Sequence, residues 1–355
     1  MKALVLSGGS GTRLRPFSYS MPKQLIPIAN RPVLEHVVES IRAMGVTEIG
    51  IVVGSWGATI ADVIGDGSRF GARITYIPQD EPMGLAHCVQ LARPFLGDDD
   101  FVMYLGDNML PDGVTHVAEE FTASRPAAQV VLHRVSDPRA FGVAEVDESG
   151  AVQRLVEKPQ HPKSDLALIG VYFFTKAIHQ AVDTIKPSAR GELEITDAIQ
   201  LMLEQGAQIK ASLYEGYWQD TGRAEDVLEC NARLLAALTS RIDGEVDDTS
   251  ELSGTVVIAA GARVVRSKLV GPIIVGADSV VEDSHIGPGT SIGTGCTLRA
   301  TRITESIVLA GANIANVPGL HRSLIGRSAS VSPSDRGIAQ HRMVIGDNTV
   351  IEVAA

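Results

Sequence analysis

The sequence has 355 residues, of which 45% are hydrophobic and 21% charged, and its formal net charge at pH 7 is −11. This length and apolar content are enough for two packed domains, and they exclude a disordered or fibrous chain. The acidic balance argues against a nucleic-acid-binding surface, so any anionic substrate must be bound by local cations.

The chain begins with an apolar strand, Ala3 to Leu6, followed by a glycine-rich loop. Glycines lack side chains, so the backbone N–H groups beside them can approach an anionic group closely. The glycines are Gly8, Gly9 and Gly11, and two separated cations, Arg13 and Lys23, follow them. This order predicts a phosphate-binding loop.

The loop matches neither of two common phosphate-binding fingerprints. A dinucleotide-binding pattern beginning at Gly9 has its first two glycines, but Leu14 occupies the place of the third. A P-loop needs Lys followed by Ser or Thr after its last glycine, and no such pair follows Gly11. A plain glycine turn would leave the cations unexplained.

From Met1 to about Leu238, strand-like and helical segments alternate, which predicts a mostly parallel sheet covered by helices, with ligands at the carboxyl ends of the strands. The expected strands are Glu48 to Val53, Arg73 to Ile77, Phe101 to Leu105 and Gln129 to His133, and the expected helices are Leu34 to Met44, Leu85 to Leu96 and Val114 to Ala123. Three further strands, predicted to be antiparallel, are Phe141 to Val146, Val152 to Val156 and Ala167 to Phe174.

Several polar residues follow the expected strands. Asp107 and Asp220 each stand at the end of an expected strand, where a hard cation such as Mg²⁺ could be held against phosphate oxygens, although an Asp taken alone is more often a turn former or a helix cap. Gln79 presents a donor and an acceptor that suit a nucleobase edge, and Gly84 allows close backbone approach. Glu157 and Lys158 close another strand; taken alone, they would be a solvated pair.

After Leu238 apolar residues recur every six positions, as is typical of a parallel β-helix in which the apolar residue of each hexapeptide points inward. Ordinary strands would instead show a period of two. The recurring positions are Ile258, Val264 and Val270, then Ile274, Val280, Ile286, Ile292 and Leu298, and finally Val308, Ile314 and Leu320.

The N-terminal run from Leu6 to Pro16, followed by Pro22-Lys23-Gln24, resembles the signature of the sugar-1-phosphate nucleotidylyltransferases, most closely the long-form glucose-1-phosphate thymidylyltransferases. The family usually has alanine at the position of Ser7. The resemblance extends through the repeats to Val344–Asn348. It implies a Rossmann-like α/β catalytic domain over residues 1–240, with a mostly parallel mixed sheet, and a left-handed parallel β-helix over 241–355.

The resemblance implies that the chain uses dTTP and glucose 1-phosphate, with Mg²⁺ as cofactor. Catalytic roles fall to Arg13, Lys23 and Asp107, and metal ligation to Asp107 and Asp220. The nucleotide would be bound by Leu6, Gly8, Gly9, Gly11, Thr12, Arg13, Gln24, Gln79, Pro82 and Gly84. The sugar phosphate would be bound by Gly142, Glu157, Lys158, Gly170, Tyr172 and Arg190.

Three other functions remain open from the sequence. The same chemistry could act on another base, another sugar or a cyclitol phosphate. The β-helix could transfer acetyl groups, with His285 or His321 as the base, although it is short for that purpose. A non-catalytic regulatory subunit should have lost Arg13, Lys23, Asp107 or Asp220, and all four are present.

The remaining expectations concern location and assembly. Cys88, Cys230 and Cys296 are odd in number and lack metal-type spacing, which indicates buried, reduced thiols and a cytoplasmic protein. No signal peptide or membrane-spanning run is recognised. The exposed ends of a short β-helix favour a homo-oligomer.

Overall fold

The computed structural model describes residues 1–148 and 150–333 and divides into two compact units. The first unit contains Met1–Ser10 and Val33–Asp220, and the second contains Gly11–Pro32 together with the chain from Thr221 onward. The sequence-based boundary at residue 240 stays a prediction. Val344–Asn348 lies outside the described residues.

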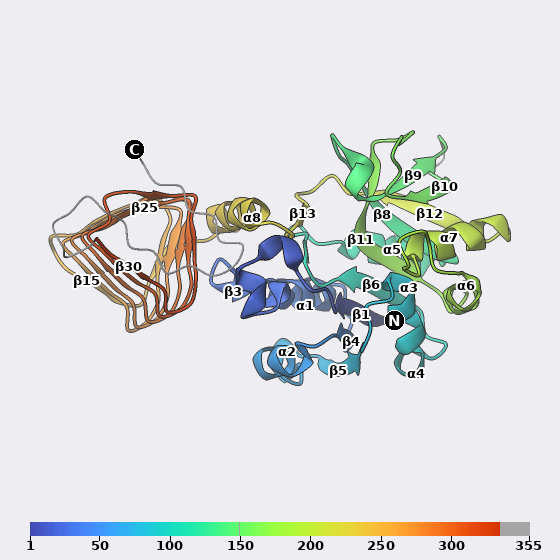
Figure 1. Ribbon diagram of the computed structural model, residues 1–355, viewed down its shortest axis with the longest axis horizontal. Coiled ribbons are helices and arrows are strands. Elements are labelled where there is room, and N and C mark those ends of the chain that lie inside the picture. The colour runs from blue at the N-terminus through green and yellow to red at the C-terminus, as the bar shows by residue number, and fades with distance from the viewer. Residues whose placement is uncertain (149, 334–355) are drawn as a thin grey trace. The chain divides into compact units, whose positions relative to one another are not determined.

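The first unit is built on a nine-stranded sheet whose main order is β10-β9-β11-β6-β1-β4-β5, with β8 joining β11 to β12 (Figure 1). Strands β1, β4, β5 and β6 are mutually parallel, whereas β9, β10 and β11 pair antiparallel, which confirms both sequence predictions. The strands are β1 (Lys2–Ser7), β4 (Glu48–Val53), β5 (Arg73–Pro78), β6 (Phe101–Leu105), β8 (Ala128–Arg134), β9 (Gly142–Val146), β10 (Val152–Glu157), β11 (Leu166–Phe174) and β12 (Ile209–Leu213).

Helices supply the apolar side chains that cover this sheet. They are α1 (Val33–Ala43), α2 (Gly57–Ile64), α3 (Leu85–Leu91), α4 (Arg93–Leu96), α5 (Thr115–Ser124), α6 (Ile178–Thr184) and α7 (Ile195–Glu204). The single helix expected over 85–96 is two helices, because Pro94 has no N–H group to continue α3 and instead occupies the first turn of α4.

The second unit contains helix α8 (Ala224–Ala236), the short hairpin of β2 (Pro27–Ile28) and β3 (Arg31–Pro32), and three parallel sheets stacked as coils (Figure 1). The first sheet contains β14 (Arg241–Ile242), β17 (Val256–Ile258), β20 (Ile273–Val275), β23 (Thr290–Ile292), β26 (Ile307–Val308) and β29 (Leu324–Ile325). The second contains β15 (Glu245–Val246), β18 (Arg263–Val265), β21 (Val280–Glu282), β24 (Thr297–Arg299), β27 (Asn313–Ala315) and β30 (Ser330–Val331). The third contains β16 (Glu251–Ser253), β19 (Lys268–Val270), β22 (His285–Ile286), β25 (Arg302–Thr304) and β28 (Leu320–His321). This is the arrangement expected of a left-handed parallel β-helix.

The six-residue period fails at a corner in several of the coils. Val264 pairs with Val281, and Leu269 pairs with Ile286, so one coil takes 17 residues and not three times six. The corner residues Arg266, Asp283 and Ala300 have positive φ and turn the chain with one residue fewer. Three predicted inward positions were therefore wrong by one residue: Val270, Ile274 and Val280 are half-buried, while Leu269, Ile273, Val275 and Val281 fill the core.

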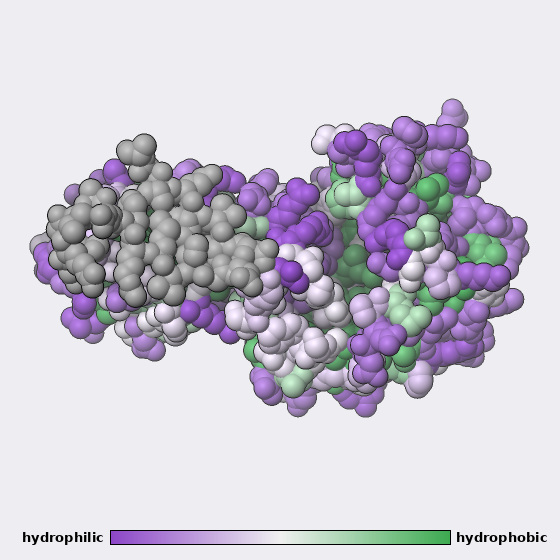
Figure 2. Space-filling model, in the orientation of Figure 1, coloured by the Kyte–Doolittle hydropathy of each residue, from purple (hydrophilic) through white to green (hydrophobic). Residues whose placement is uncertain are grey.

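The polarity of the surface and the burial of the cysteines agree with what the sequence predicts. The visible face of the first unit is mostly hydrophilic, and its apolar side chains show in scattered patches (Figure 2). All three cysteines are buried outside any disulfide bond in the described structure. Within the same residues, the helices are too short or too polar to cross a bilayer.

Ser7 at the end of β1 provides a stability test. Its side chain is buried, and its Oγ has no hydrogen-bond partner among the described residues. A buried hydroxyl without a partner costs about 1–3 kcal/mol. We expect Ser7→Ala to raise the free energy of unfolding in urea by about 1 kcal/mol.

The matched control is Ser212→Ala in β12. The hydroxyl of Ser212 is also buried, but it donates to Glu120 Oε2 at 2.9 Å and accepts from Gln129 Nε2 at 2.7 Å. We expect Ser212→Ala to lower the free energy of unfolding by about 1–2 kcal/mol. Equal losses for the two variants would contradict the interpretation of Ser7.

Candidate active site

Gly8 and Gln79 meet at the carboxyl ends of β1 and β5. A β-carbon built on Gly8 would lie 2.6 Å from Gln79 Oε1, so any other residue there would displace the end of the Gln79 side chain. The backbone N–H of Gln79 donates to the carbonyl of Val53 at 2.8 Å, which extends the pairing of β4 and β5 by one residue. The structure thus brings together two residues predicted to bind the nucleotide, which are 71 positions apart in the sequence. Leu6 lies buried in β1 just before them.

Two residues that sequence reasoning did not select orient the Gln79 amide. Gln79 Nε2 donates to Cys88 Sγ at 3.2 Å and lies 3.2 Å from His87 Nδ1, both on α3. Burial raises the pKa of the Cys88 thiol to about 12, so this group is neutral at physiological pH. The amide nitrogen is therefore held by α3, while the amide oxygen is directed toward Gly8. His87 and Cys88 could have been identified from the sequence by their position in the first turn of the helix that follows Gly84.

Gly84, at the start of α3, has a backbone conformation that only glycine adopts readily, with φ 105° and ψ 171°. A β-carbon built there would lie 2.7 Å from the Leu193 nitrogen and closer still to its carbonyl oxygen. The neighbouring N–H of Ala86 donates to that same carbonyl at 3.0 Å. Close packing within the protein therefore accounts for this glycine; its predicted contact with a base, like that of the exposed Pro82, remains a prediction.

We expect Gly84→Ala to lower the free energy of unfolding by about 3–5 kcal/mol, because it combines a backbone clash with an unfavourable φ. Gly206→Ala is the control. Gly206 also has positive φ, 82°, but open space surrounds its β position in the described structure, so its expected loss is about 1 kcal/mol. Denaturant unfolding measures both changes. An equal loss of unfolding free energy in Gly84→Ala and Gly206→Ala would show that the Leu193 contact is unimportant.

Asp107 and Asp220 are brought to neighbouring positions by a two-stranded ladder. β7 (Asn108–Met109) pairs antiparallel with β13 (Gln219–Asp220), and Asp220 is directly opposite Asn108. Asp107 is 9% exposed and follows Gly106, which packs closely on Ser7. The ladder thus places the two aspartates at neighbouring backbone positions, and a pair of carboxylates is a donor set that suits a hard divalent cation. In the described residues, no third acidic, His or Cys side chain completes a metal cluster with them.

Trp218 and Asn108 support the carboxylate of Asp107. Trp218 Nε1 donates to Asn108 Oδ1 at 2.7 Å, and Asn108 Nδ2 donates to Asp107 Oδ1 at 3.3 Å. The indole ring packs edge-on against Phe141, with a centroid separation of 5.2 Å. Sequence reasoning left the role of Trp218 undecided, and the structure shows that it packs and also orients Asn108.

Glu157 ends β10 opposite Gly142 of β9. A β-carbon built on Gly142 would lie 3.2 Å from Glu157 Oε2 and 2.8 Å from Thr196 Cγ2. The buried Thr196 hydroxyl donates to Glu157 Oε2 at 3.1 Å. Thr196, on α7, was not selected from the sequence, although it lies within the Arg190–Asp197 segment. Glu157 also acts on Asp197, whose pKa is raised chiefly by burial and further by this carboxylate.

The two cations predicted to bind the sugar phosphate both face Glu157. Lys158 Nζ lies 3.5 Å and Arg190 Nη1 3.3 Å from Glu157 Oε1. Arg190 also contacts Glu194 at 3.2 Å and Glu192 at 3.1 Å, so three carboxylates share its charge. A phosphate bound here would replace part of this ion-pair network.

Gly170 lies where β11 changes its register against β8. Its φ is 77°, and a β-carbon there would lie 2.8 Å from Leu105 Cδ1 and 3.0 Å from Asn108 Nδ2. The glycine thus lets β11 approach the end of β6, which leads into Asp107. Tyr172 is 4% exposed in the core, where burial raises its pKa. Its predicted contact with the sugar remains a prediction.

The second unit contains the two predicted catalytic cations in the segment Gly11–Pro32, named here the cation loop. Gly11 has a φ of 63°, and a β-carbon on it would lie 3.3 Å from Lys23 Cβ, so this glycine and Lys23 pack together. Burial raises the pKa of the Asp226 carboxyl on α8, and nearby Arg223 and Arg13 oppose that shift. Arg13 therefore lies within electrostatic range of α8.

The other two predicted nucleotide ligands in the cation loop differ in exposure. Thr12 is exposed, whereas Gln24 is 1% exposed. In the described part of the chain, Gln24 Oε1 has no hydrogen-bond partner. Gly9 is exposed just before the loop. The nucleotide contacts of all three residues remain predictions.

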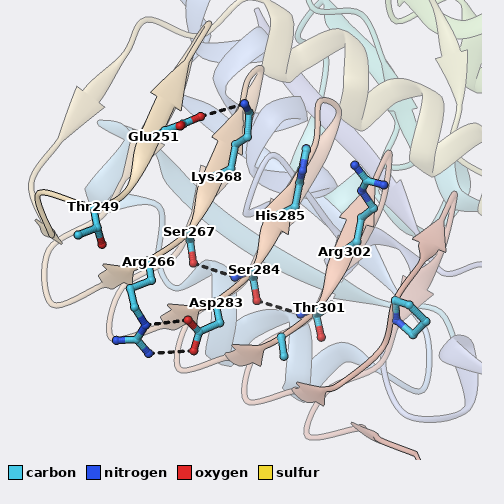
Figure 3. A pocket seen from close by; sticks show the side chains of 12 residues that line it. Thr249, Glu251, Arg266, Ser267, Lys268, Asp283, Ser284, His285, Thr301 and Arg302 are labelled. Atoms are coloured by element: carbon cyan, nitrogen blue, oxygen red, sulfur yellow. Dashed lines mark hydrogen bonds and ion pairs between the residues drawn. The ribbon is translucent and has the colours of Figure 1, made fainter.

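A separate hollow of about 630 Å³ lies on one face of the β-helix (Figure 3). His285 lies between Lys268 and Arg302 on successive coils, and burial together with these two cations lowers its pKa. Lys268 is paired with Glu251 at 2.9 Å, and Arg266 with Asp283 at 2.7 Å. His321 Nδ1 lies 2.9 Å from Thr304 Oγ1 on a neighbouring coil. Ion pairs between residues of neighbouring coils therefore neutralise much of the charge around this hollow.

Comparisons with known proteins agree with this arrangement. A family model described as nucleotidyl transferase matches residues 2–237. The chain is 50% identical over 354 residues to a glucose-1-phosphate thymidylyltransferase of Streptomyces antibioticus, covering 99% of each sequence. It is 49% identical over 355 residues to one of Streptomyces griseus, covering 100% of each. A solved structure from Bacillus anthracis, described as a glucose-1-phosphate thymidylyltransferase in complex with sucrose, has a TM-score of 0.62 and 35% identity, covering 66% of this chain and 94% of that one.

Proposed function

Since the chain belongs to the nucleotidyl transferase family, we propose that it transfers a thymidylyl group from dTTP to glucose 1-phosphate, giving dTDP-glucose and pyrophosphate. The observation that carries this proposal is the neighbouring placement of Asp107 and Asp220 by the β7–β13 ladder, in a chain that matches thymidylyltransferases over its whole length. In the proposed reaction, a phosphate oxygen of the sugar phosphate attacks the α-phosphorus, and pyrophosphate leaves.

The residues of the chain fit this chemistry without a covalent nucleophile or a general base. The attacking phosphate oxygen is already anionic near neutral pH, so catalysis consists of alignment and charge neutralisation. Gln79, with its amide oriented by Cys88, is proposed to hold the base. Glu157 is proposed to accept hydrogen bonds from sugar hydroxyls, and Lys158 and Arg190 to bind the sugar phosphate. Arg13 and Lys23 are proposed to contact the triphosphate.

The donor set of Asp107 and Asp220 fits a divalent cation. Two hard carboxylate oxygens are a common protein contribution to a Mg²⁺ site, in which phosphates and water complete the coordination. Magnesium held by these two residues would offset the negative charge that grows on the α-phosphate. Trp218 and Asn108 keep the Asp107 carboxylate in place through hydrogen bonds.

The test is the identity of the product. The purified full chain is incubated in magnesium buffer with glucose 1-phosphate and, separately, dTTP, UTP, GTP or ATP, and both the nucleotide sugar and pyrophosphate are measured. We expect the highest kcat/KM with dTTP. A higher value with another triphosphate, or preference for a different sugar phosphate, would replace the proposed substrates. Release of CoA thiol from acetyl-CoA with glucosamine 1-phosphate would establish the acetyltransferase alternative.

We also propose a cytoplasmic homo-oligomer. Three buried thiols outside any disulfide suit a reducing compartment. The end coils of a β-helix expose strand edges whose burial against a second copy would be favourable. Light scattering at micromolar concentration should give a mass above that of one chain, and a monomeric mass would exclude the assembly.

A further inference from the structure

The hairpin at the end of the cation loop turns through two residues with left-handed backbone conformation. Ala29 has a φ of 48° and Asn30 a φ of 62°, as a two-residue type I′ turn requires. Asparagine tolerates this conformation, but alanine adopts it rarely and at an energetic cost. Interactions around the turn must therefore stabilise Ala29 in this conformation.

Asn231 of α8 provides the first of these interactions. Its side chain is fully buried, and its Oδ1 accepts the backbone N–H of Ala29 at 2.9 Å. The same oxygen accepts the hydroxyl of Ser291 at 2.6 Å, and Asn231 Nδ2 donates to the carbonyl of Gly289 at 3.0 Å. Ser291 lies in β23 and Gly289 directly before it. One buried amide therefore joins the hairpin, helix α8 and a coil of the β-helix.

Asn30 provides a second interaction with the same coil. Its Nδ2 donates to the carbonyl of Ile292 at 2.7 Å, and that oxygen also accepts the Gly276 N–H of the coil ladder at 2.7 Å. A third contact lies further along: Phe17 of the cation loop is 3.6 Å from the position that a β-carbon on Gly326 would occupy. The loop thus contacts the β-helix through its hairpin and approaches it again at Phe17.

The predicted catalytic cations are tightly linked to these contacts. The carbonyl of Lys23 accepts the N–H of Ile26 at 3.1 Å, one residue before β2. The side chains of Leu25, Ile26 and Ile28 are buried, so a shift of the hairpin would move Lys23 as well. Arg13 approaches α8 near Asp226, five residues before Asn231.

We propose that Asn231 and Asn30 are positioning residues, through which the β-helix fixes the cation loop in one placement for the reaction. This inference rests on the proposed roles of Arg13 and Lys23. Buried polar networks that are fully hydrogen-bonded specify a unique arrangement of the groups they join, and alignment dominates the proposed chemistry. The β-helix then contributes to catalysis within its own chain, apart from any role in assembly.

The test compares two variants that remove these hydrogen bonds with two control variants, all made in the full chain. Asn30→Gly removes the hydrogen bond to Ile292 but keeps a residue that tolerates φ 62°, and Asn231→Ala removes the buried amide. Ala29→Gly is the matched turn control, because it relieves the unfavourable φ and retains both hydrogen bonds. Ser279→Ala is the control within the β-helix: its buried hydroxyl donates to the Gly293 carbonyl at 2.7 Å and accepts the N–H of Cys296 at 3.0 Å, and the cation loop is not among these partners.

We expect Asn30→Gly and Asn231→Ala to lower kcat about tenfold, with smaller changes in KM, when assayed below their unfolding temperatures. Hydrogen exchange should increase over residues 11–32 in these two variants and remain at the wild-type level there in both controls. Wild-type kcat and wild-type exchange in folded Asn30→Gly would overturn the proposal, even if Asn231→Ala does not fold. The exchange readout needs no substrate, so it is independent of the product assay that tests the proposed function.

Discussion

Replacing Lys23 with alanine should lower kcat for pyrophosphate release by about 10²–10³-fold, with a much smaller change in either KM. Loss of one charge that stabilises a transition state costs roughly 3–4 kcal/mol when the ground-state complex makes little use of it. Lys23 packs against Gly11 at the start of the cation loop, which limits the positions that its ammonium group can reach.

Arg15→Ala is the matched control for Lys23→Ala. Arg15 is another cation of the same loop, but its guanidinium lies over the ring of Tyr19, 4.9 Å from the centroid. Both variants remove one positive charge from the loop, so a general electrostatic effect would lower their rates alike. We expect the kcat of Arg15→Ala to stay within a fewfold of the wild-type value. Near-normal turnover in Lys23→Ala would exclude the transition-state role.

The second large effect is expected for Asp107→Asn. The substitution keeps the shape of the side chain and removes one of the two neighbouring carboxylates, so kcat should fall by about 10³-fold, which corresponds to several kcal/mol of lost charge stabilisation. The magnesium concentration that gives half-maximal rate should rise as well. Titration of activity with MgCl₂ measures both changes.

Asp100→Asn serves as the control because it lies at the opposite end of the same strand. Asp100 comes directly before β6 and pairs with Arg125 at 2.7 Å, whereas Asp107 follows β6 after Gly106. An exposed pair of this kind contributes about 1 kcal/mol or less to stability. We expect the activity of Asp100→Asn to depend on magnesium concentration as that of the wild type does. An unchanged magnesium dependence in Asp107→Asn would show that this carboxylate holds no metal.

Much of the first unit could be predicted from the sequence because its strands are short apolar runs with little ambiguity. Glu48–Val53 and Phe101–Leu105 have the predicted bounds. The side chains after these strands were good candidates for a site, since the carboxyl ends of parallel strands share one edge. The ladder that joins Asp107 to Asp220 could not be read from the sequence, because its two strands have two residues each and lie 110 positions apart.

Other features depend on contacts that no local pattern specifies. The five-residue step from Val281 to Ile286 follows from positive φ at Asp283, a non-glycine residue whose conformation its neighbours determine. The grouping of Lys158 and Arg190 around Glu157 joins β10 to a segment more than 30 residues later. Asn231 looks like an ordinary polar residue within an amphipathic helix until its three hydrogen bonds are known.

The position of β23 in its sheet determines how securely the cation loop is held. In a stack of coils, each coil is stabilised mainly by the coils on its two sides, so fraying begins at the outermost turns and moves inward. The hairpin docks on β23, which is flanked by β20 and β26 and by further strands beyond each of them. An end coil can therefore open, or exchange partners with another molecule, while the coil beneath Ala29 and Asn30 keeps its shape.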